Sequence, residues 1–166
     1  MVDAIKSADS DDALSRTHAD IETAGDTVSV LTRYDEGGTW FSFGRNGGSI
    51  DYTITVPAGV ALKISNVSGV IRLTAPVGNV DASNVSGTIH ADLGVVNGSR
   101  RIALHAISGG IHAVIARKSD VRVSASAISG DISEFGSGDT HAMRLGSGSA
   151  SMNLSTISGD ITVSPQ

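Results

Sequence analysis

Two histidines occupy equivalent positions in a repeated phrase, an arrangement that could bring two metal ligands together. His90 follows Ile89 and His112 follows Ile111. If the segments that carry them are neighbouring strands, the two imidazoles project outward and stack about 5 Å apart, close enough to share a transition metal. Asp92 could add a carboxylate, but no third histidine is evident at that column. We therefore interpret the histidines as an exposed pair and predict no metal site.

A serine precedes each of five regularly spaced glycines. These serines are Ser68, Ser86, Ser108, Ser129 and Ser158. Serine hydroxyls at corners commonly bond the backbone of their own turn, and a row of them could also contact a polysaccharide. Nucleophilic catalysis would need a base and a group that orients the base, and neither accompanies these serines. We predict no catalytic residue, no cofactor-binding residue and a non-enzymatic chain.

The acidic residues do not form an evident site either. Asp131 and Asp160 occupy turn corners, where a structural role is expected, whereas a glycosidase clusters its carboxylates along one groove. The run Asp9, Asp11 and Asp12 lacks the remaining positions of a calcium loop, so we expect a solvated loop there.

Composition narrows the class of partner and the compartment. The net charge is −5, lysine and arginine are spread evenly, and the six aromatic residues (4%) do not alternate with basic ones, which argues against nucleic acid. There is no cysteine, so disulfides and thiolate metal sites are excluded. No apolar run approaches the ~20 residues of a transmembrane segment. Residues 1–6 lack the apolar centre of a signal peptide, so the chain is either cytoplasmic or trimmed of a leader, and its strand-like start favours trimming.

The five glycines recur at spacings that predict a stacked β architecture. They stand at 69, 87, 109, 130 and 159, and each is followed two residues later by an isoleucine: Ile71, Ile89, Ile111, Ile132 and Ile161. With weaker turn signals between them, turns arrive about every ten residues, and the residues between turns alternate apolar and polar as strands do. The sequence predicts an all-β fold, a single-stranded parallel β-helix or solenoid. Each coil has about 20 residues and two strands, coils stack about 4.8 Å apart, and the isoleucines form a ladder inside.

The chain divides into an N-terminal cap region at 1–56 and solenoid repeats at 57–166. Residues 17–33 and 40–56 each read as a β-hairpin. Five of the six aromatic residues lie within 34–52, where they would cover the open end of the stack; the alternative is an aromatic platform for sugar rings. Residues 131–156 exceed one coil, so we expect an extra hairpin or arm there.

The entry Val56-Pro57-Ala58-Gly59 and the phrases at 128–132 and 157–161, both Ile-Ser-Gly-Asp-Ile, carry a resemblance. Over residues 56–163 the chain resembles the bacterial "putative adhesin" β-strand-repeat proteins, a domain of unknown function related to autotransporter-adhesin-like head domains. The copies at Gly69, Gly87 and Gly109 lack the aspartate of that phrase. The resemblance implies a right-handed β-helix and an extracytoplasmic place, in the periplasm or at the cell surface. It implies no established enzymatic activity and no catalytic residue.

Our first functional hypothesis is a non-enzymatic β-solenoid at the bacterial cell envelope that presents a rigid surface for interaction or adhesion, with a protein or cell-surface glycan as partner. Outward residues such as Arg72, His90, His112 and Arg122 are candidate contributors. The alternative is a structural subunit that polymerises end to end, a homo-oligomer formed through its terminal coil. Residues 163–166 end without an obvious cap, so that edge is either open to another subunit or covered by residues 136–148. A glycan-active enzyme is a distant third hypothesis.

Overall fold

The structure is a computed structural model in which residues 2–7, 11, 15, 17–24, 27–34, 49–55, 57, 59–74, 78–134, 137–138 and 142–166 are described. The chain separates into two compact units, Met1–Val56 and Pro57–Gln166.

The strands in the described part of the first unit form two antiparallel pairs. Strand β1 (Val2–Ser7) pairs with β4 (Ser49–Ile54), and β2 (Thr17–Ala24) pairs with β3 (Thr27–Tyr34). The hairpin predicted at 17–33 is confirmed, with Ala24 opposite Thr27 across its turn. Of the hairpin predicted at 40–56, the returning strand is β4, and its partner is β1. Its first arm, with Trp40, lies outside the described residues, and the capping role of this unit stays a prediction.

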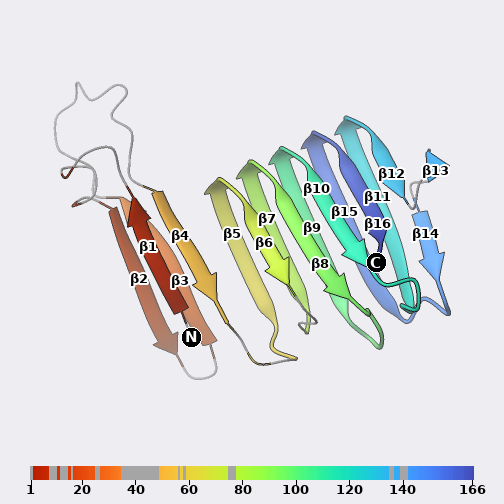
Figure 1. Cartoon of the computed structure of the whole chain (residues 1–166), viewed down its shortest axis with the longest axis horizontal. Helices are drawn as coiled ribbons and strands as arrows, with labels where there is room; N and C mark the ends of the chain where they lie inside the picture. The colour runs from red at the N-terminus through yellow and green to blue at the C-terminus, as the bar shows by residue number, and fades with distance from the viewer. Residues whose placement is uncertain are drawn as a thin grey trace. The chain divides into compact units, whose positions relative to one another are not determined.

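The second unit is built from two six-stranded sheets whose strands alternate along the chain (Figure 1). One sheet contains β5 (Leu62–Ser68), β7 (Val80–Ser86), β9 (Arg101–Ser108), β11 (Val121–Ser129), β14 (Ala142–Leu145) and β15 (Ala150–Ser158). The other contains β6 (Ile71–Thr74), β8 (Ile89–Gly94), β10 (Ile111–Ile115), β12 (Ile132–Glu134), β13 (Ser137–Gly138) and β16 (Ile161–Pro165). All pairs are parallel except those made by β13 and β14. The predicted all-β fold with coils of two parallel strands is confirmed; the handedness of the coil stays a prediction.

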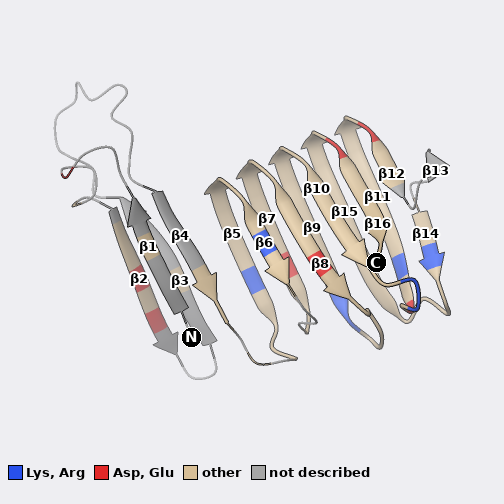
Figure 2. Ribbon diagram, viewed as in Figure 1, with Lys and Arg blue, Asp and Glu red and all other residues tan. Residues whose placement is uncertain are grey.

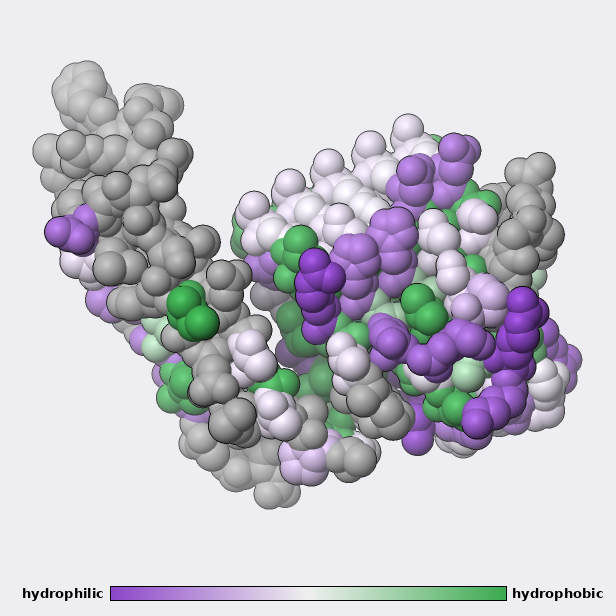
Figure 3. All heavy atoms as spheres, in the orientation of Figure 1, coloured by the Kyte–Doolittle hydropathy of each residue, from purple (hydrophilic) through white to green (hydrophobic). Residues whose placement is uncertain are grey.

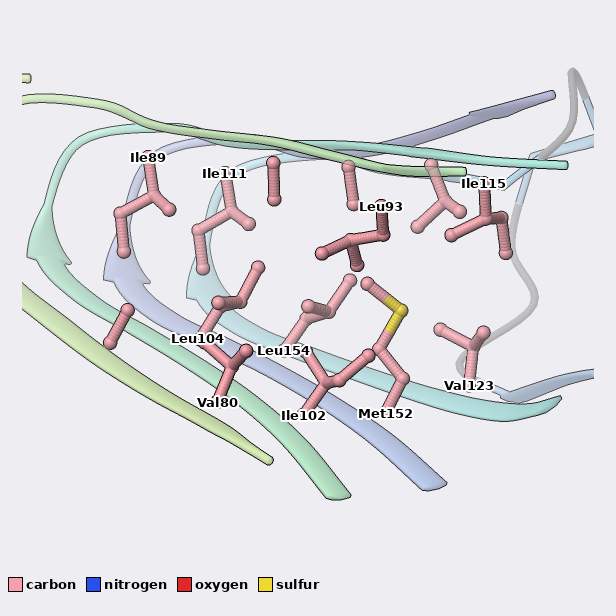
Figure 4. Close-up of a cluster of buried hydrophobic side chains, with 14 of the residues drawn as sticks. Val80, Ile89, Leu93, Ile102, Leu104, Ile111, Ile115, Val123, Met152 and Leu154 are labelled. Carbon is pink, nitrogen blue, oxygen red and sulfur yellow. The ribbon is translucent and has the colours of Figure 1, made fainter. Parts of the chain in front are cut away.

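The core lies between these two sheets. The isoleucines that follow the repeated glycines pair in one ladder, in the spatial order Ile71, Ile89, Ile111, Ile161 and Ile132. The first four are buried and the last is half-buried. Side chains of the opposite sheet, such as Leu104 and Met152, point toward this ladder (Figure 4). Branched aliphatic side chains pack well on pleated surfaces, so the predicted internal ladder is confirmed.

The repeated glycines stack in a column where each coil turns from one sheet to the other. All five have φ between 117° and 144°, a region that L side chains rarely adopt. A Cβ atom added to Gly109 would lie 1.8 Å from the carbonyl oxygen of Gly87, and one added to Gly87 would lie 2.0 Å from that of Gly69. The amide of each corner glycine in the inner coils donates to the serine carbonyl of the next coil, for example Gly87 to Ser108 at 3.0 Å. Glycine is therefore required by conformation at all five positions, and also by space at Gly87, Gly109, Gly130 and Gly159.

We expect Gly109→Ala to lower the free energy of unfolding by about 3 kcal/mol or more, because it adds a clash with backbone to an unfavourable φ. Urea unfolding followed by far-UV circular dichroism measures the change. Gly98→Ala is the matched control: Gly98 has φ of 72° but nothing within 4 Å of an added Cβ, so it should cost only about 1–2 kcal/mol. Equal losses in the two variants would contradict the close approach of the coils.

The coils do not stack in the order of the sequence. Strands β15 and β16 lie between the coil of β9 and β10 and the coil of β11 and β12 (Figure 1). The prediction that residues 163–166 form an end of the stack is therefore wrong: β16 has a hydrogen-bonded neighbour on both sides. The end coil is that of β11 and β12. The expected extra element within 131–156 is present as two short strands that do not pair with each other: β13 pairs antiparallel with β12, and β14 pairs antiparallel with β11.

The turn that follows β14 is hydrogen-bonded to Asp120, and it carries the chain from the outer edge of β11 to the inner edge. Strand β14 ends at Leu145, opposite Val121, and β15 begins with Ala150 paired to Val121 on the other side. The Asp120 carboxylate accepts hydrogen bonds from the Ser147 hydroxyl at 2.8 Å and from the backbone N–H groups of Gly148 and Ser149. Its backbone carbonyl accepts from Ala150 N–H at 3.0 Å. Asp120 thus fixes the place at which the last coil enters the stack.

The ionised form of Asp120 should stabilise the second unit. Hydrogen bonds from the Ser149 and Ser147 side chains and from backbone N–H groups hold its pKa well below the ordinary 3.8. The stabilisation is therefore full above pH 3.8 and is lost as the pH falls below that value toward the lowered pKa. We expect Asp120→Asn to lower the free energy of unfolding at pH 7, and this deficit to shrink as unfolding is measured at progressively lower pH.

The control for that series is Asp81→Asn, which removes an exposed carboxylate from β7. It should change stability by no more than about 0.5 kcal/mol. A deficit in Asp120→Asn that is the same at pH 7 and pH 3 would show that the charge of Asp120 does not hold the turn.

Candidate interaction surface

An exposed aliphatic column runs along the outer face of the sheet formed by β5, β7, β9, β15 and β11. Its members each stand two residues before a corner glycine, and the register of the strands places them side by side. In spatial order they are Val67 (71% exposed), Val85 (43%), Ile107 (49%), Ile157 (48%) and Ile128 (82%). We call these five residues the Val/Ile column. Single exposed aliphatics are ordinary, but a continuous row of them is typical of an interaction site.

A polar column lies beside it on the same face, two residues earlier in each strand. It consists of Ser65, Ser83, His105, Ser155 and Ser126. The Ser83 hydroxyl donates to that of Ser65 at 3.1 Å, and His105 Nδ1 lies 2.6 Å from Ser155 Oγ. A serine nucleophile would need its histidine oriented by a third group. Among the described residues no side chain other than Ser155 is hydrogen-bonded to His105, so the contact ties two strands together without forming a catalytic set.

The corner serines do not use their hydroxyls as predicted. All five are exposed, and no hydrogen bond joins their hydroxyls to another described residue. Inward residues bond the corner backbone instead: Asn84 Nδ2 donates to the Gly69 carbonyl at 2.9 Å, and Thr156 Oγ1 to the Gly109 carbonyl at 3.2 Å. The serine row is therefore a free row of hydroxyls next to the Val/Ile column.

Of the two corner aspartates, Asp160 has the predicted structural contact. Asp160 Oδ1 accepts a hydrogen bond from the backbone N–H of Asp131 in the neighbouring coil at 3.0 Å. Asp131 is exposed at the corner of the end coil. The carboxylate of Asp160 thus has a structural role at the turn.

The second sheet carries the predicted histidine pair. His90 and His112 are directly opposite each other on β8 and β10, and their rings stack with centroids 5.0 Å apart and planes inclined by 14°. Arg72 stands at the next position of the row, on β6. Hydrophilic side chains gather on this face of the second unit (Figure 3). Burial, and then the proximity of His112 and Arg72, lower the pKa of His90 below 6.5. The predicted geometry of the pair is confirmed, and the neutral imidazole is favoured.

Loss of one histidine should be visible in the titration of the other. We expect His112→Gln to raise the pKa of His90, because a neighbouring positive charge is removed, while burial still holds that pKa below 6.5. Proton NMR of the imidazole Cε1–H signals across the acid and neutral range measures it. His105→Gln, on the opposite sheet, should leave the His90 titration unchanged; a His90 curve that is identical in His112→Gln would contradict the stacking.

Of the other predicted contributors, Arg122 lies on β11, in the sheet opposite the one that carries Arg72, His90 and His112.

Within the part of the chain that is described, no group of three or more His, Asp or Glu side chains is placed to hold a metal ion. The described residues also include no helix of the length and apolar character needed to cross a membrane.

Sequence reasoning missed the Val/Ile column and the contact between His105 and Ser155. The column did have a signal in the sequence. In β5, Ile64 faces inward, so strict alternation also places Asn66 inward and Val67 outward, even though Val67 is the apolar residue of the two. The contact had none, because it requires β15 to lie beside β9, which the sequence order does not suggest.

Comparison with known proteins gives a family and one related structure. The family model described as Toastrack DUF4097 matches residues 46–164. No curated protein matches the chain. A crystal structure of a "putative cell adhesion protein" from Clostridium sporogenes is similar with a TM-score of 0.61 and 10% sequence identity, covering 91% of this chain and 77% of that one. At this identity the similarity shows a shared fold.

Proposed function

The chain belongs to the Toastrack family, and from this premise we propose that it is a non-enzymatic β-solenoid presenting a rigid surface for interaction or adhesion at the bacterial cell envelope. The observation that carries the proposal is the Val/Ile column. Five coils contribute one exposed Val or Ile each, although the alternation of the strands would allow a polar residue at every one of these positions.

The chemistry of this face suits binding more than turnover. A stable interface has an apolar centre and a polar rim with hydrogen-bonding groups. The Val/Ile column supplies the first, and the flanking rows of serine hydroxyls supply the second. The backbone below is held by hydrogen bonds on both sides in the inner coils, so little conformational freedom is lost when a partner binds.

The partner class we propose is a protein or a cell-surface glycan outside the cytoplasm, in the periplasm or at the surface. The related Clostridium sporogenes structure is that of a "putative cell adhesion protein", and this description supports the assignment. End-to-end polymerisation through the C-terminal coil has lost its basis, because that coil lies inside the stack.

The test is cosedimentation of the purified protein with isolated cell envelopes of the source organism. We expect the wild type to sediment and Ile107→Ser/Ile157→Ser to lose at least about tenfold in apparent affinity, because two central apolar contacts are removed. Both side chains are about half exposed, so the variant should remain folded. Val60→Ser/Val70→Ser, which removes two exposed valines outside the column, is the control.

Envelopes treated beforehand with protease or with a wall-degrading glycosidase separate a protein partner from a glycan. If the wild type does not sediment with intact envelopes, or if both double variants sediment equally well, the proposal is wrong.

A further inference from the structure

Positive charge in the second unit gathers at one end of its strands. The eight Lys and Arg residues of 57–166 are Lys63, Arg72, Arg100, Arg101, Arg117, Lys118, Arg122 and Arg144. The last six lie in or beside the turns opposite the glycine corner, where Asp81, Asp92 and Asp120 also lie, whereas Asp131 and Asp160 lie at that corner (Figure 2). The sequence carries 4 basic and 10 acidic residues in 1–56, and 8 basic and 7 acidic in 57–166. The overall charge of −5 is thus the sum of −6 for residues 1–56 and +1 for residues 57–166. We call the six residues Arg100, Arg101, Arg117, Lys118, Arg122 and Arg144 the basic margin of the repeats.

Three arginines of this margin form a straight row across four strands. Arg101 on β9 is paired with Ser151 on β15, Ser151 with Arg122 on β11, and Arg122 with Arg144 on β14. Buried neighbours alternate with them, so the three arginines point outward on the same face, and all are exposed. With strands about 4.8 Å apart, the row from Arg101 to Arg144 spans about 14 Å. We call Arg101, Arg122 and Arg144 the arginine row.

No described carboxylate neutralises this row. Arg122 and Arg144 are directly opposite in an antiparallel pair, and like charges in that position destabilise a sheet. None of the three forms an ion pair with a described residue; Arg144 donates instead to the neutral backbone carbonyl of Ser147. The carboxylate nearest to the row along the chain, that of Asp120 just before β11, already accepts hydrogen bonds from Ser147, Gly148 and Ser149. Such an arrangement lowers stability and is explained by an anionic partner.

A shallow hollow continues the row at the Arg101 end. Its volume is about 470 Å³, and its polar lining includes Lys63, Asn79, Asp81, Ser99 and Arg101. The hollow adds a fourth cation, Lys63, whose charge is offset by Asp81 directly opposite it on β7, and several hydrogen-bonding groups on the same outer face. A chain lying along the row would enter this hollow.

We propose that the arginine row and the adjoining hollow bind a linear polyanion whose repeating units carry phosphate. Guanidinium groups match phosphate geometry with paired hydrogen bonds, and several of them in line favour a chain over a single ion. The only Phe, Trp or Tyr of residues 57–166 is Phe135, so the repeats have no platform on which nucleobases could stack. The three arginines lie within strands and not on projecting turns. A polymer chain lying along the sheet can reach all three, and this position therefore favours such a chain over a planar membrane surface.

This site lies on the same sheet face as the Val/Ile column but at the other end of the strands. It does not depend on that column. Binding of a phosphate polymer can therefore hold if envelope binding through the column fails, and the reverse is equally true.

Long-chain inorganic polyphosphate is the probe, with binding to the full chain followed by fluorescence anisotropy of labelled polymer at several salt concentrations. We expect Arg101→Gln/Arg122→Gln to weaken binding at least about tenfold. The slope of log affinity against log salt concentration should also fall in magnitude by about one to two, because the variant has two fewer phosphate contacts at which binding releases counter-ions. Arg72→Gln/Lys118→Gln removes the same charge elsewhere and should bind like the wild type. The arginine variant should unfold at the same urea concentration as the wild type, or a higher one, since like charges are removed.

Several results would overturn the proposal. These are no binding by the wild type, equal loss in the two double variants, or binding to phosphatidylglycerol vesicles without binding to polyphosphate, which would indicate a membrane surface. Tighter binding to oligothymidylate than to polyphosphate would indicate nucleic acid. Unchanged polyphosphate binding by Ile107→Ser/Ile157→Ser would support a site separate from the column.

Discussion

The close approach of backbone at the corner glycines sets the geometry of the whole second unit. A carbonyl oxygen of one coil occupies the space where a side chain of the next would begin, so the second coil of each such pair can approach only where it carries glycine. This contact fixes the register at one point in every coil. Because side chains alternate with a period of two, a fixed register at the corner also aligns each outward and inward position along the strands. The buried isoleucine ladder, the Val/Ile column and the arginine row are all consequences of that alignment.

Much of this could be read from the sequence. The spacing of the glycines, the isoleucine two residues after each, and the alternation between turns predict parallel coils of two strands. The stacking of His90 on His112 followed from the same register, because both residues stand three positions after a corner glycine. These predictions hold because they depend on local pattern and on coils that are adjacent in the chain.

The order of the last two coils could not be predicted. Each copy of the phrase presents the same glycine, serine and isoleucine to its neighbour, so any coil can pair with any other, and local sequence does not choose among them. In the structure, hydrogen bonds to the Asp120 carboxylate hold the turn through which the chain passes from β14 into β15. At two members of the Val/Ile column, Val85 and Ile157, the inward neighbour is polar: Asn84 and Thr156 are inside and bonded to corner carbonyls, and the apolar residues beside them are outside. There the usual rule of apolar in and polar out is overruled by the need to satisfy backbone groups at the corner.

The interior position of β15 and β16 has a consequence for biosynthesis. The ribosome makes β11 before β15, yet β11 has no parallel neighbour until β15 has been made, and β9 and β10 likewise wait for the last coil. The growing chain therefore carries two coils with unpaired strand edges, that of β9 and β10 and that of β11 and β12, on either side of the position that the last coil later fills. Unpaired edges are where strands of different chains join, so this intermediate is the form of the protein most exposed to aggregation. A cell that makes it has reason to shield the nascent chain until β16 emerges.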